Sequence, residues 1–68
     1  MLTEERYAVI TEMVNQRGSI KLTDLCDMLG ISVSTARRDI NALDEMGKIT
    51  KVHGGAVSRS ERFFPIED

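Results

Sequence analysis

The sequence predicts a mainly α-helical fold that ends in a small β-hairpin, and three observations lead to this prediction. Apolar residues recur at helical spacing within residues 3–17 and 32–47. Two helical segments meet at a very short break at Gly30-Ile31, as in a helix-turn-helix. Further on, two short alternating runs flank Gly54-Gly55, the signal of a tight hairpin. Together they predict a winged helix-turn-helix with three helices, a short strand and a two-stranded wing.

The first helix is expected to run from Thr3 to the residue before Gly18. Thr3 is a good N-cap because its hydroxyl can accept a free backbone N–H of the first turn. Gly18 ends the helix, since glycine readily leaves helical geometry. The apolar residues at helical spacing form the buried stripe: Tyr7, Ile10 and Val14.

Residues 19–21 are too short for a helix and predict one strand, which would pair with the hairpin downstream. A second helix is expected over residues 22–29, with three leucines at helical spacing: Leu22, Leu25 and Leu29. Its start is open, because Lys21 is a poor cap and Thr23 could serve if the helix began later. Gly30 then breaks this helix just before the next one begins.

The third helix is expected between Ser32 and Gly47. Ser32 is a good N-cap, because its hydroxyl can accept the backbone N–H of Ser34 or Thr35. Gly47 can take positive φ after the last turn. Four apolar residues form the expected buried stripe: Val33, Ala36, Ile40 and Leu43.

The face of the third helix opposite this stripe carries the candidate binding residues Ser34, Thr35, Arg37, Arg38 and Asn41. Arginine can bind guanine or phosphate, asparagine can read adenine, and a helix N-terminus favours phosphate oxygens. This composition is expected of a helix in the major groove of DNA. Two alternatives stay open: an ordinary solvated face, and a Thr35 hydroxyl that helps to cap its own helix.

The hairpin is expected to use residues 48–53 and 56–58 as strands, with Gly54-Gly55 as the two central turn residues. Lys51 and His53 lie just before the turn. Wing residues commonly touch phosphate or the adjacent minor groove, so both are candidate DNA contacts. His53 has no second ligand at metal-binding spacing, and no metal site or cofactor is expected.

The composition further limits the size, the cellular location and the charge pattern of the protein. Sixty-eight residues suffice for one small domain. A single cysteine and the lack of a long apolar run predict a cytoplasmic protein without a membrane segment. The net charge is −2, but residues 32–60 carry five basic against three acidic side chains. Residues 1–31 carry three against five, and residues 61–68 carry one against three. The positive excess therefore coincides with the third helix and the hairpin.

Catalysis is not expected, because no nucleophile–base pair, carboxylate pair or phosphate-binding loop is present. Two charged residues lie instead on the rims of apolar faces. Arg6 precedes Ile10 by four residues, and Asp39 borders the stripe of the third helix. We expect Arg6 and Asp39 to form an ion pair that docks the first helix on the third, because a charge at the edge of a core needs a partner.

The chain resembles the DeoR-type bacterial transcriptional regulators. The pattern begins with an arginine and two aliphatic residues at four-residue steps, and continues through the start of the third helix. Its members here are Arg6, Ile10, Val14, Ser32, Thr35, Ala36, Arg37, Arg38, Asp39 and Ile40. The run His53-Gly54-Gly55-Ala56 also resembles the wing of the family. The likeness covers about residues 3–58.

This resemblance implies sequence-specific binding of double-stranded operator DNA, by a repressor of sugar or nucleoside catabolism. It divides the chain into a DNA-binding domain, residues 1–58, and a linker, residues 59–68, toward a C-terminal domain. In the full-length protein that second domain would sense a phosphorylated sugar and form a homo-oligomer. The tail could equally be a disordered segment. The alternative function is a winged helix that docks on another protein.

Overall fold

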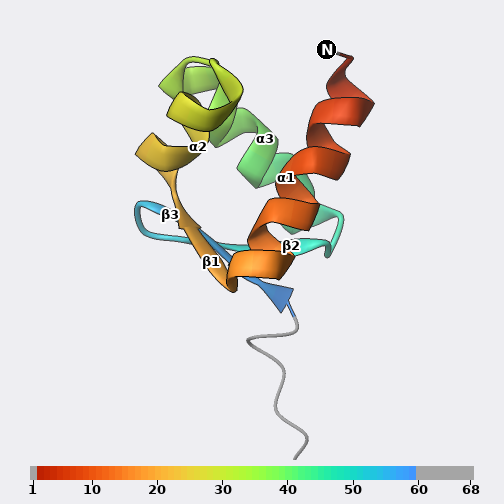
Figure 1. The fold of residues 1–68 in the computed structure, drawn as a ribbon. Helices are drawn as coiled ribbons and strands as arrows, with labels where there is room; N and C mark the ends of the chain where they lie inside the picture. Colours follow the sequence, from red (N-terminus) through yellow and green to blue (C-terminus); the bar gives the residue numbers. More distant parts are fainter. Residues whose placement is uncertain (1, 60–68) are drawn as a thin grey trace, which may run out of the picture.

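The computed structural model describes residues 2–59 and has the winged helix-turn-helix architecture predicted from the sequence (Figure 1). In chain order its elements are α1 (Thr3–Arg17), β1 (Ser19–Lys21), α2 (Leu22–Leu29), α3 (Val33–Glu45), β2 (Ile49–Val52) and β3 (Gly55–Ser58). No helix among the described residues is long and apolar enough to cross a membrane. The linker prediction for residues 59–68 lies, apart from Arg59, outside the described residues, so this boundary stays a prediction.

One apolar core lies between the helices and the sheet, and every element contributes to it. The buried side chains are Ile10 and Val14 of α1, Ile20 of β1, Leu25 of α2, Ala36, Ile40 and Leu43 of α3, Ile49 of β2 and Ala56 of β3. Leu22 and Leu29 are only half-buried at its margin. Because three residues of α3 are anchored in this core, the rotation of α3 about its axis is fixed and its opposite face is turned outward.

The start of α1 differs from the prediction. Thr3 is the first helical residue, and Leu2 occupies the N-cap position. A leucine side chain has no acceptor, so the Glu5 carboxylate satisfies the helix start by accepting the Leu2 backbone N–H at 3.2 Å. The end is as predicted, since the Gly18 N–H donates to the Val14 carbonyl oxygen at 2.7 Å.

The turn between α2 and α3 follows the sequence pattern closely. α2 begins at Leu22, directly after β1, and Gly30 closes it in the left-handed conformation with φ +66°. Ser32 then caps α3 as predicted, because its Oγ accepts the Thr35 backbone N–H at 3.2 Å. The prediction that Val33 is buried was wrong. Its side chain is 45% exposed, because this first residue of α3 lies beyond the edge of the core.

The sheet has the order β1-β3-β2, and both pairings are antiparallel. The short strand therefore pairs with the hairpin, as predicted. The turn itself is shifted by one residue. Val52 pairs with Gly55, so His53 and Gly54 are the central residues, with Gly54 at φ +81°. Gly55 belongs to β3, where a Cβ would lie 2.2 Å from the carbonyl oxygen of Ile20. Close approach of two strands, rather than a turn, therefore requires that glycine.

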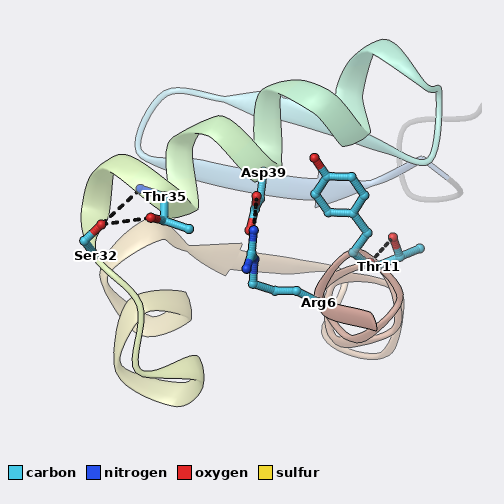
Figure 2. Close-up of polar contacts among 6 residues, drawn as sticks. Arg6, Thr11, Ser32, Thr35 and Asp39 are labelled. Atoms are coloured by element: carbon cyan, nitrogen blue, oxygen red, sulfur yellow. Dashed lines mark hydrogen bonds and ion pairs between the residues drawn. The ribbon is translucent and has the colours of Figure 1, made fainter. Parts of the chain in front are cut away.

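The predicted ion pair between Arg6 and Asp39 is present and joins α1 to α3 (Figure 2). The Arg6 Nε donates to Asp39 Oδ2, and its Nη2 donates to Oδ1 at 3.0 Å, so the contact is bidentate. The Asp39 side chain is only 2% exposed. The hydrogen bond to Asp39 raises the pKa of the Arg6 guanidinium above its usual value.

Candidate nucleic-acid interface

α3 presents a continuous polar face to the outside. Ser34, Arg37, Arg38 and Asn41 are exposed, as the helical periodicity predicts. Among residues 2–59, no side chain forms an ion pair or hydrogen bond with either guanidinium of this face. Two arginines on a rigid helix thus keep all of their donors available for an external ligand, and an acceptor-rich ligand such as a phosphate backbone or a guanine edge satisfies them.

The N-terminal end of α3 forms a small hydroxyl cluster (Figure 2). Ser32 Oγ accepts the Thr35 backbone N–H and also donates to Thr35 Oγ1, at 3.1 Å. Thr35 therefore takes part in the cap of its own helix, which is one of the two roles considered for it. Ser34 lies between these two residues and is exposed.

A groove separates α3 from the wing and brings together residues that are far apart in the sequence. Arg37 and Asn41 line it from α3, and Lys51 and His53 line it from the hairpin. These four residues are called the groove set. The groove has a volume of about 380 Å³ and opens to solvent. It therefore brings together four of the seven predicted binding residues: two cationic side chains, one imidazole and one amide.

The remaining predicted residues lie outside this groove. Ser34, Thr35 and Arg38 do not line it and belong to the neighbouring flank of α3. Ser34 and Arg38 are called the ridge set. On a helical wheel the ridge set lies farthest from the buried stripe, whereas Arg37 lies on the side of the wing. The predicted site thus consists of a ridge and an adjacent groove on one side of the domain.

One carboxylate of α3 is neutralised within the fold. Asp39 follows Arg38 directly in the sequence, but its side chain points to the opposite side of α3 and pairs with Arg6. The only ion pair among residues 2–59 is this one. An unpaired carboxylate at this point would repel phosphate, so the Arg6–Asp39 contact supports the basic character of α3 as well as its docking.

Five further residues, which the sequence does not mark as part of a site, complete the groove: Leu22, Ile40, Val52, Gly54 and Gly55. No local pattern marks them, because the groove depends on how the hairpin packs beside α3. The exposure of Val33 was not predicted either, since its helical spacing assigns it to the buried stripe. Across residues 2–59, no three His, Cys, Asp or Glu side chains gather as a candidate metal site.

An exposed basic face on the second helix of a helix-turn-helix, flanked by a wing, defines a DNA-binding domain. The chain belongs to the DeoR-like helix-turn-helix family, whose model matches residues 6–62. It is 40% identical over its whole length to a lactose phosphotransferase system repressor of Streptococcus mutans, of which it covers 26%.

Two other relatives match 82% of the chain. A lactose phosphotransferase system repressor of Staphylococcus epidermidis is 45% identical over 56 residues, and the HTH-type transcriptional regulator UlaR of Escherichia coli is 46% identical over 56 residues. The chain covers 22% of each of these two proteins, so it spans about a quarter or less of the relatives that it matches. No solved structure matches the chain significantly.

Proposed function

We propose that this chain reads operator DNA for a bacterial transcriptional regulator, with α3 in the major groove and the wing against the neighbouring backbone. The observation that best supports this proposal is the arrangement of α3. One face of the helix is anchored in the core, and Arg37 and Arg38 project from its exposed side without ion-pair partners among residues 2–59. A solvated helix face alone would not explain why the groove set converges from two separate elements.

Each set has its own role in this proposal. Arg38, in the ridge set, contacts a guanine edge or phosphate, and Ser34 and Thr35 contact phosphate at the helix start. In the groove set, Arg37 clamps a phosphate, Asn41 reaches a base edge, and Lys51 and His53 contact the backbone or minor groove. The chain needs no metal or cofactor for this binding and catalyses no reaction.

The proposal extends to the protein of which such a domain is part. The names of two relatives point to repression of a lactose phosphotransferase system. We therefore expect the regulated genes to serve carbohydrate or nucleoside catabolism. The full-length regulator is expected to be a cytoplasmic homo-oligomer that responds to a phosphorylated sugar through a C-terminal domain. Sedimentation of the full-length protein with and without such sugars tests this part separately.

DNA binding is tested by selecting sequences from a random duplex pool with the 68-residue chain. Its affinity for the selected duplex and for a scrambled one is then measured by fluorescence anisotropy at several salt concentrations. We expect tighter binding to the selected duplex, and a slope of log affinity against log salt of about −0.9 per neutralised phosphate. Binding without salt dependence, or equal affinity for both duplexes, would contradict the proposal and favour a protein-docking role.

A further inference from the structure

Val33 is an apolar residue at the exposed tip of α3. Its side chain is 45% exposed, whereas the stripe residues that follow it, Ala36, Ile40 and Leu43, are at most 2% exposed. The reason is geometric. Cα–Cβ bonds of a helix tilt toward its N-terminus, so the first side chain extends past the end of the helix and past the core. Val33 therefore faces whatever approaches the N-terminal end of α3.

The residues around Val33 are those of the proposed DNA interface. Val33 precedes Arg37 by four residues and Asn41 by eight, so the three lie in one row along α3 that leads into the groove. Ser34 of the ridge set is its direct neighbour. Val33 is the apolar member of this otherwise polar row, and its branched side chain has little rotamer freedom in a helix.

We propose that Val33 packs against the 5-methyl group of a thymine and so helps to determine the sequence that this domain reads. This inference rests on the proposed function. In a helix-turn-helix the N-terminal residues of the second helix meet the base edges. The thymine methyl is the apolar group that the major groove displays, and apolar side chains recognise thymine through it. A rigid valine at the helix tip is suited to that contact.

The test is a double-mutant cycle on the selected duplex. Each thymine in turn is replaced by deoxyuridine, which lacks the methyl group, and affinities are measured for the unmodified chain and for Val33→Ala. At one position we expect the replacement to weaken binding of the unmodified chain about three- to fivefold, the effect of exposing one buried methyl group. The same replacement should leave the affinity of Val33→Ala unchanged.

Met46→Ala is the matched control, because Met46 is a similarly exposed apolar residue (50%) just beyond the opposite end of α3. This variant should keep the uracil sensitivity of the unmodified chain. If Val33→Ala shows the same uracil sensitivities as the unmodified chain on a duplex that both bind specifically, the inference is wrong while the proposed function stands. If the unmodified chain does not discriminate between selected and scrambled duplexes, both are wrong. Circular dichroism confirms that each variant is folded.

Discussion

Three consecutive charged residues of α3, Arg37, Arg38 and Asp39, lie in two contrasting environments. Asp39 points into the interface with α1, is 2% exposed and is held by both donors of Arg6. Arg37 and Arg38 are exposed and have no ion-pair partner among residues 2–59. Charge therefore has two roles in this one helix. The buried Asp39 positions α3 through its ion pair, and the exposed Arg37 and Arg38 are available to bind a ligand.

Asp39→Asn should have the largest effect on stability. The substitution keeps the shape of the side chain but leaves Arg6 without its counter-charge in a half-buried position. Removing one partner of a buried ion pair lowers the free energy of unfolding more than replacing both partners does. We expect the melting temperature of the chain to fall by roughly 10 °C. Thermal unfolding followed by circular dichroism measures this.

Glu45→Gln is the matched control for this prediction, because Glu45 lies on the same helix, is exposed, and has no ion-pair partner among residues 2–59. It should move the melting temperature by no more than about 3 °C. Equal melting temperatures for Asp39→Asn and Glu45→Gln would show that the Arg6–Asp39 contact does not position α3.

Arg38→Ala should have the largest effect on binding. If Arg38 reads a base, its loss costs about 1–3 kcal/mol, which is about five- to 150-fold in affinity for the selected duplex. The melting temperature should stay within the range of the Glu45→Gln control, because the Arg38 side chain is exposed and forms no ion pair among residues 2–59. Anisotropy titrations against selected and scrambled duplexes distinguish two roles. An equal loss on both duplexes would assign Arg38 to phosphate instead of a base.

Ser32→Ala lies at the boundary between the two sides of α3 and should have an intermediate effect. It removes the acceptor for the Thr35 N–H and the hydroxyl that donates to Thr35. Loss of such a cap costs about 1 kcal/mol of unfolding free energy. Urea denaturation checks this value. Ser32→Asp, which restores an acceptor, should recover most of the loss, and failure to recover it would indicate that the cap does not explain the effect.

Arg37→Ala and Lys51→Ala should have the smallest and least sequence-dependent effects, because both residues of the groove set are assigned to phosphate. Each variant should bind selected and scrambled duplexes more weakly by a similar factor, and the salt slope should become shallower by about 0.9 for each lost phosphate contact. Arg17→Ala, an exposed arginine in the last turn of α1, is the control and should leave the slope unchanged. A change confined to the selected duplex would assign either residue to base reading.

The sequence predicts most of this fold because its signals are local. Apolar spacing, the Ser32 cap and the position of Gly47 define α3, and the rim positions of Arg6 and Asp39 predict their pairing. The remaining features depend on tertiary packing. Val33 is exposed because the core does not extend to the first residue of α3, and the neighbouring residues in the sequence do not indicate where the core ends. Asn41 and His53 likewise line the same groove only because the hairpin is placed beside α3.

The hairpin shows a different limit. Two adjacent glycines both permit positive φ, so the composition alone does not decide which of them occupies the turn. Strand pairing decides it: Gly55 is placed opposite Val52 and close to the Ile20 carbonyl oxygen, and Gly54 remains for the turn. The start of α1 is similar, since the Glu5 carboxylate accepts the Leu2 backbone N–H and the cap contact expected from Thr3 is not formed.

Binding of DNA by the outer face of α3 is tested most directly by titrating the isotopically labelled chain with the selected duplex and following the backbone amide chemical shifts. We predict that the largest shifts occur in residues 33–41 of α3 and 51–54 of the wing, while residues 8–17 of α1 change little. Saturable binding with the largest shifts confined to residues 8–17 would show that the outer face of α3 is not the surface that meets DNA.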